Sequence, residues 1–186
     1  MTYRMLALPL IAAAAIGLSA CSSQNPGNAV GDSSTTSAPT TTSSSAGGAS
    51  TLASVDPCSL VTQDVISKSG LQAPTPANAS GGRACRWNHP DDGATVDGYQ
   101  VQIVIYDTAG MDQLNTSGGT VADYSTGKYQ GKIYQETALN ACLIALPTGS
   151  SSRIDLDVVS SLGIDQGCKL VKQLTPLVVA NFPAGT

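Results

Sequence analysis

Large apolar and polar residues alternate most clearly in "YQVQIVIY", residues 99–106. Successive side chains of a β-strand point to opposite faces, so this stretch predicts a strand with one buried and one wetter face. Residues 153–160 repeat the pattern, with charged residues between aliphatic ones. Three further segments read as strands bounded by turn residues, at residues 83–88, 128–136 and 141–147.

Helical signals flank these strands. Asp56 is suited to cap a helix that has Pro57 at its first position, Thr62 offers a second N-cap, and Gly70 ends the element. These signals predict one broken helix or two short ones. Near the C-terminus, residues 165–182 place apolar side chains at helical spacing, with an acidic residue as a candidate cap.

The order of elements predicts the α+β fold class, with an antiparallel β-sheet of about five strands packed by N-terminal and C-terminal helices. Residues 72–82 are rich in Pro, Asn and Gly and are predicted to form a loop. Residues 109–119 are predicted to hold one helical turn, followed by loop up to the strand at 128–136.

The start of the chain has the layout of a signal peptide, with one positive charge followed by the uncharged apolar residues 6–18. This apolar run is shorter than the roughly 20 residues that a membrane-spanning helix needs. Leu18-Ser19-Ala20-Cys21 resembles the bacterial lipobox, which implies cleavage before Cys21 and attachment of diacylglycerol to its sulfur. The alternative is an ordinary secretory signal cleaved after Ala20.

Composition then divides the chain into three parts. Residues 1–20 are predicted to be the lipoprotein signal peptide. Residues 21–54 comprise the lipidated cysteine and a tether rich in Ser, Thr, Gly and Pro, which cannot bury enough apolar surface to order itself. The tether is predicted to be a flexible spacer, with glycosylation of its Ser/Thr/Pro tract as the alternative. Residues 55–186 have the usual size of one globular domain.

Apart from Cys21, the chain has four cysteines, an even number that suits an exported domain with two disulfides. Three connectivities are possible. We favour Cys58 with Cys85 and Cys142 with Cys168, because each pair joins a predicted helix terminus to a neighbouring predicted strand. No C-x-x-C pair occurs and the spacings match no zinc site, so we expect no metal and no cofactor.

Few residues suggest catalysis. The chain lacks the common nucleophile, metalloprotease and phosphate-loop motifs, and its net charge of -4 argues against nucleic acid as a partner. His89 precedes Asp91 and Asp92, but "HPDDG" is ordinary turn chemistry. Asp155 and Asp157 share one face of a strand, where they are interpreted as the wet side of an edge or surface strand rather than as a catalytic pair.

Arg86 and Trp87 are the residues that we single out as a possible partner-binding pair. Tryptophan and arginine are enriched at binding hot spots. The alternative, favoured for this only tryptophan because it follows Cys85, is that Trp87 packs against a disulfide in the core. Five tyrosines lie on or near predicted strands and would form a binding surface if they shared an exposed face: Tyr99, Tyr106, Tyr124, Tyr129 and Tyr134.

"DPC" at 56–58, "CRW" at 85–87, "AC" at 141–142 and Cys168 together resemble a family of small actinobacterial lipoproteins with a domain of unknown function. The resemblance covers residues 55–186. It implies a secreted, lipid-anchored α+β domain, supports the two favoured disulfides and brings no activity or catalytic residues with it.

The sequence therefore predicts a lipid-anchored cell-envelope protein that is a non-catalytic binding or interaction module. It would face the outside of the cytoplasmic membrane, hold that membrane through Cys21, and bind an unknown protein or a cell-wall component. The alternative is a carrier or sensor of a small apolar ligand held between sheet and helix, because the aromatic-poor core would leave room for one. A hydrolase built around His89 or Asp157 ranks third.

Overall fold

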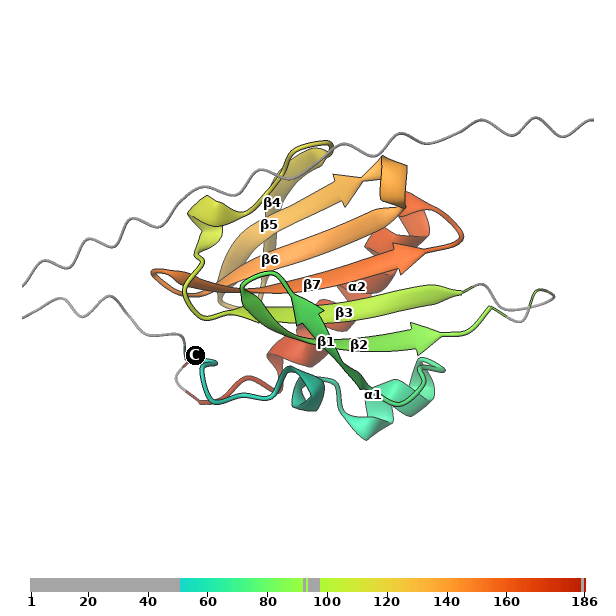
Figure 1. Ribbon diagram of the computed structural model, residues 1–186, viewed down its shortest axis with the longest axis horizontal. Coiled ribbons are helices and arrows are strands. Elements are labelled where there is room, and N and C mark those ends of the chain that lie inside the picture. Colours follow the sequence, from blue (N-terminus) through green and yellow to red (C-terminus); the bar gives the residue numbers. More distant parts are fainter. Residues whose placement is uncertain (1–50, 92, 94–97, 185) are drawn as a thin grey trace, which may run out of the picture. The chain divides into compact units, whose positions relative to one another are not determined.

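The computed structural model describes residues 51–91, 93, 98–184 and 186. The predicted signal peptide, Cys21, most of the predicted tether and Asp92 lie outside the described residues. The described chain forms one seven-stranded, fully antiparallel sheet in the order β1-β2-β3-β7-β6-β5-β4 (Figure 1). The strands are β1 Thr75–Ala79, β2 Gly82–His89, β3 Tyr99–Tyr106, β4 Thr120–Thr126, β5 Tyr129–Glu136, β6 Ala141–Gly149 and β7 Ser152–Ser160.

Two α-helices and three short 3-10 helices complete the described fold. They are η1 Pro57–Leu60, α1 Gln63–Lys68, η2 Met111–Gln113, η3 Thr137–Leu139 and α2 Ile164–Val179. The N-terminal pair confirms the prediction of two short helices: the Asp56 carboxylate accepts from the Cys58 N–H, and the Thr62 hydroxyl accepts from the Val65 N–H. α2 begins after Gly163 without a side-chain cap, and Asp165, the acidic residue expected from the sequence to cap this helix, lies in its first turn instead.

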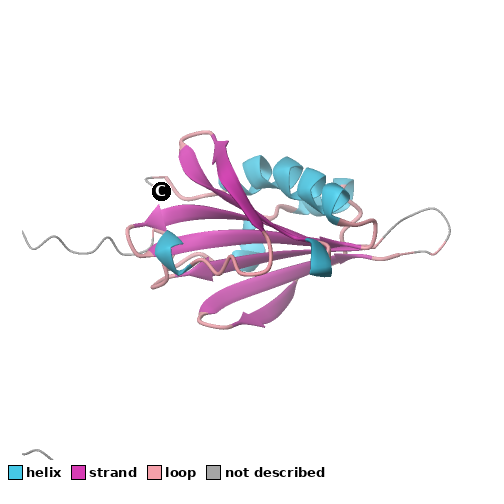
Figure 2. Cartoon of the chain, turned by 90° about the horizontal axis from the view of Figure 1, so that it is seen from above, coloured by secondary structure: helices cyan, strands magenta, loops and turns pink. Residues whose placement is uncertain are grey.

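One face of the sheet packs against α2, η1 and α1, and we call it the helix face (Figure 2). Register brings a row of aliphatic side chains together there, because Ile103 pairs with Leu156, Leu156 with Ile144, and Ile144 with Ile133. From the helix side, Val171 of α2 is fully buried against this row. Every residue of the core cluster lies between Leu52 and Phe182, and the compact unit that contains it begins at Ser43, so this part of the chain supplies its own core.

Two disulfides fasten the helices to the helix face, Cys58–Cys85 and Cys142–Cys168. They are the two pairs favoured from the sequence. Each joins the start of a helical element to a strand and closes a loop with a sequence separation of 27 or 26. In the chain-entropy account, a disulfide that closes a loop of this length stabilises the folded state by roughly 3 kcal/mol.

The prediction of about five strands is wrong by two, since β1 and β4 fall in segments predicted as loop. Both are edge strands. β1 contains Pro76 and lies mostly in solvent, while in β4 polar side chains are exposed on both faces. An edge strand needs to bury neither face fully, so it leaves little periodic signal in the sequence.

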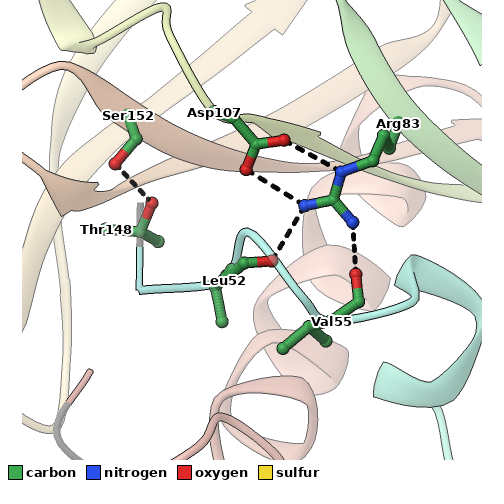
Figure 3. Close-up of polar contacts among 6 residues, drawn as sticks. All are labelled: Leu52, Val55, Arg83, Asp107, Thr148 and Ser152. Carbon is green, nitrogen blue, oxygen red and sulfur yellow. Dashed lines mark hydrogen bonds and ion pairs between the residues drawn. The ribbon is translucent and has the colours of Figure 1, made fainter. Parts of the chain in front are cut away.

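The domain also begins earlier than the predicted boundary at residue 55. Leu52 is fully buried in the core. Arg83 of β2 holds this segment: its guanidinium donates to the carbonyls of Leu52 (2.8 Å) and Val55, and it forms a two-pronged ion pair with Asp107 (2.9 and 3.0 Å; Figure 3). Thr51 reinforces the contact by donating to the Thr148 carbonyl. Residues 51–54 therefore belong to the folded domain and not to the tether.

Candidate binding site on the open face of the sheet

The face of the sheet opposite the helix face carries polar side chains at its centre, and we call it the open face. Arg153, Asp155 and Asp157 alternate there along β7. β7 is the fourth of seven strands, and Asp155 is only 3% exposed. The interpretation of these aspartates as the wet side of an edge or surface strand is therefore wrong: alternation shows which side chains share a face but not whether that face is covered.

Arg153 and Asp155 form a buried ion pair. The Arg153 Nε lies 3.0 and 3.2 Å from the two carboxylate oxygens, and the two side chains are 6% and 5% exposed. Burial raises the pKa of Asp155 to about 6, although the Arg153 charge opposes this shift. The Tyr106 ring stacks on the Arg153 guanidinium at 4.1 Å, which adds a cation–π contact.

The open face is covered by the chain between β3 and β4, residues 107–119, which we call the crossing segment. β3 and β4 are separated in the sheet by β7, β6 and β5, so this connection spans about 19 Å at the usual strand spacing. Arg153 Nη1 donates to the carbonyls of Ala109 (3.2 Å) and Gly110 (2.8 Å), and the Tyr134 hydroxyl donates to the Ser117 carbonyl (2.7 Å). Side chains of β7 and β5 thus hold the segment at both ends.

A groove of about 520 Å³ is lined by residues of the crossing segment and of the turn that joins β1 to β2. The turn provides Ser80 and Gly81, and Gly81 has a φ of 75°, which glycine adopts without strain. The residues that line the groove are Ser80, Gly81, Tyr106, Thr108, Ala109, Gln113, Asn115 and Arg153. This lining contains one guanidinium, several amides and hydroxyls, and no carboxylate.

Arg153 still has hydrogen-bonding capacity toward this groove. A guanidinium has five N–H donors. The contacts above use Nε and Nη1, whereas Nη2 has no partner among the described residues and is not one of the buried atoms left unpaired. Arg153 lines the groove, so its guanidinium borders the space that a ligand would occupy.

A second polar cluster lies farther along the open face, where Arg86, Gln102 and Asp157 are cross-strand neighbours. The Arg86 Nη2 donates weakly to the Gln102 side chain at 3.4 Å, while Arg86 Nε and Asp157 Oδ1 are buried without a partner in the described chain. Burial, followed by repulsion from Asp155 and Glu136, raises the pKa of Asp157 to about 6. Ionisation of Asp157 therefore lowers the free energy of unfolding.

The other residues singled out from the sequence are mostly structural. Trp87 is fully buried on the helix face, so it is a core residue and cannot contact a partner in this structure, while Arg86 points to the opposite face. The tyrosines do not share one face: Tyr106 and Tyr134 lie on the open face, whereas Tyr99, Tyr124 and Tyr129 pack against the helix-face core. They form no common surface.

His89 has a structural environment as well. Its ring stacks on Tyr99 with the centroids 4.7 Å apart, and its Nδ1 lies 3.1 Å from the Pro90 carbonyl. The nearby Asp91 carboxylate accepts from the Gly93 N–H, as in an ordinary Asx turn. Across the part of the chain that the structure describes, no group of three or more metal-binding side chains comes together.

Sequence reasoning missed the groove because its residues come from three separate segments. Arg153 was recognised only as one charged residue of an alternating strand, and Gln113 and Asn115 lie in a segment predicted as a turn and loop. The only available signal was an unusual one: two opposite charges, Arg153 and Asp155, separated by a single aliphatic residue in a strand otherwise rich in Ile, Leu and Val.

The fold and the groove define an α+β domain with a polar groove on the face of the described sheet that lies opposite α2. The chain belongs to DUF3558, a family of proteins of unknown function, whose model matches residues 16–181. No curated protein and no solved structure matches the chain. Within the described residues, no helix is both long enough and apolar enough to cross a membrane.

Proposed function

We propose that this protein is a lipid-anchored module of the cell envelope that binds an envelope component in the groove beside Arg153 and catalyses no reaction. Lipidation of Cys21 is inferred from the lipobox-like Leu18-Ser19-Ala20-Cys21. The family match begins at residue 16 and therefore spans this motif.

The observation that carries the binding role is the buried Arg153, which lines an open groove and whose Nη2 has no hydrogen-bond partner among the described residues. An arginine that is almost completely withdrawn from water normally has its N–H groups satisfied. Here the ion pair and the carbonyls of the crossing segment fix the guanidinium in place beside the groove, while Nη2 makes no hydrogen bond within the described chain. A donor fixed in this way loses little entropy when a ligand binds.

The charged groups of the open face support binding rather than catalysis. Asp155 is held by Arg153, and the free oxygen of Asp157 is enclosed in the fold. Neither carboxylate lines the Arg153 groove. The alternative carrier function receives no support from the described core, because large fully buried side chains fill the layer between the sheet and α2, among them Trp87, Ile103, Ile144, Leu156 and Val171.

The anchor is tested by expressing the full chain in an actinobacterial host. We expect the wild type in the membrane fraction, with diacylglycerol found by mass spectrometry on the N-terminal cysteine peptide. Cys21→Ala should lose both the lipid and membrane retention. Membrane retention of Cys21→Ala equal to that of the wild type would disprove the lipid anchor.

The groove is tested with the compact unit, residues 43–186, in a sedimentation assay with isolated envelopes from the same host. Gln113→Trp fills the groove from an exposed position, so it should abolish cosedimentation without disturbing the fold. Gln173→Trp is the matched control, because Gln173 is exposed on α2, which packs on the helix face. Equal binding by both variants and the wild type would exclude the groove.

A further inference from the structure

We propose that the Arg153 groove binds a neutral saccharide through its hydroxyl groups. This inference rests on the proposed function and specifies the ligand of the same site. It follows from three properties of the groove: the kind of hydrogen-bonding groups that line it, their net charge and their freedom from other partners.

The first property is a mixture of donors and acceptors. The guanidinium of Arg153 only donates, but the amides of Gln113 and Asn115 and the hydroxyls of Ser80 and Thr108 both donate and accept. A carboxylate or phosphate only accepts and would leave the acceptors of the groove unused. Sugar hydroxyls donate and accept at the same atom, so they match this lining better.

The second property is electrical neutrality. Asp155 compensates the charge of Arg153, and the groove lining has no other charged side chain. An anionic ligand would therefore meet a neutral ion pair instead of an uncompensated cation. A neutral ligand uses the same N–H donors and brings no charge that must be removed from water.

The third property is that some of the polar side chains in the lining have no other hydrogen-bond partner. Thr108 and Gln113 are exposed and have no side-chain hydrogen bonds within the described chain, while Asn115 uses only its Oδ1, which accepts from Ser117. The volume of about 520 Å³ lies within the range of small-ligand sites. The Tyr106 ring is already stacked on Arg153, so polar contacts must dominate recognition.

Amide NMR of residues 43–186 tests the assignment, with maltose, cellobiose and N,N′-diacetylchitobiose as neutral probes and glucuronic acid as the anionic probe. We expect at least one neutral disaccharide to cause saturable shifts in Ser80–Gly81 and in residues 108–115. Thr108→Ala and Gln113→Ala should each weaken its binding about fivefold, the usual effect of one lost hydrogen bond. Gln173→Ala should bind like the wild type.

Two further arms identify the source of the sugar. Delipidated cell-wall material tests a polysaccharide, and phosphatidylcholine vesicles containing a monoglucosyl diacylglycerol test a glycolipid headgroup. Groove-dependent binding to either supports the saccharide assignment.

The inference is wrong if no neutral disaccharide at millimolar concentration shifts the groove amides, or if glucuronic acid binds more tightly than all of them. If envelopes still bind in a manner that Gln113→Trp abolishes, only the ligand class is wrong and the binding module stands. If Gln113→Trp binds envelopes as well as the wild type does, the proposed function itself fails.

Discussion

The helix face and the open face of the same sheet are buried by different means. The helix face is covered by helices, two disulfides and closely packed aliphatic side chains. The open face is covered by one irregular segment, which is held by the hydrogen bonds of Arg153 and Tyr134. Apolar packing needs no particular partner, whereas a buried charge needs a specific one. Stability should therefore reside on the helix face and binding specificity on the open face.

The largest expected effect is on the helix face. Trp87→Ala removes a fully buried aromatic side chain beside the Cys58–Cys85 bridge and should lower the free energy of unfolding by about 3–5 kcal/mol. Urea denaturation followed by circular dichroism measures this loss. The control is Val121→Ala on the open face, where the side chain is 44% exposed and a change below about 0.5 kcal/mol is expected. Equal losses for the two variants would contradict the assignment of stability to the helix face.

A comparable loss is expected when the ion pair of the open face is broken. Arg153→Met leaves the Asp155 carboxylate buried without its cation, which should cost about 3–5 kcal/mol near pH 8. The loss should shrink as the pH falls through the raised pKa of Asp155, because the protonated acid needs no cation.

The control for this prediction is the double variant Arg153→Met, Asp155→Leu, which removes both charges and should recover most of the stability. This double variant should nevertheless fail to bind a ligand in the groove, because it lacks the N–H donors of Arg153. If the single variant is as stable as the wild type at every pH, the pair contributes nothing to the fold.

Sequence and structure agree where an element buries one apolar face. Strand β3 and the C-terminal helix were predictable because Val101, Ile103 and Val171 recur at the period of their element. The edge strands β1 and β4 were missed because they bury little. The crossing segment could not be predicted either: it covers the open face through main-chain carbonyls, which any sequence possesses, so only the strand order reveals its path.

The candidate site shows the same limit. Alternation correctly placed Arg153, Asp155 and Asp157 on one face, and the same rule led to the interpretation of that face as wet. Burial of the face depends on residues 107–119, which are more than 30 positions away from Arg153 in the chain. Predicting the groove would also require β1, because the turn at Ser80 joins β2 to this strand, which the sequence did not predict.

A smaller effect of opposite sign is expected at Asp157. Its folded pKa of about 6 lies above the ordinary value of 3.8, so the folded state binds the proton more tightly than the unfolded state does. The protonated carboxyl of Asp157 makes its full contribution to the free energy of unfolding below about pH 4, and this contribution is lost as the pH rises through about pH 6. Asp157→Asn removes this dependence and should stabilise the domain by about 3 kcal/mol near pH 8.

The stability gain of Asp157→Asn at pH 8 is compared with its gain at pH 4, which separates an effect of charge from one of packing. Near pH 4 the gain from Asp157→Asn should disappear, because the wild-type side chain is then neutral as well. Thermal unfolding at a series of pH values measures both limits. A gain that is the same at all pH values would show that the variant acts through packing and not through the charge.

The smallest expected effect concerns the far end of the crossing segment. Tyr134→Phe removes the hydroxyl that donates to the Ser117 carbonyl and should cost about 1 kcal/mol. The ring stays in place, so the packing of the sheet is unchanged, but the end of the segment near β4 loses its side-chain hydrogen bond. Amide hydrogen exchange should therefore accelerate in residues 114–119 and remain slow in β3 and β7. Faster exchange throughout the sheet would show that the crossing segment is part of the core rather than a cover held at its two ends.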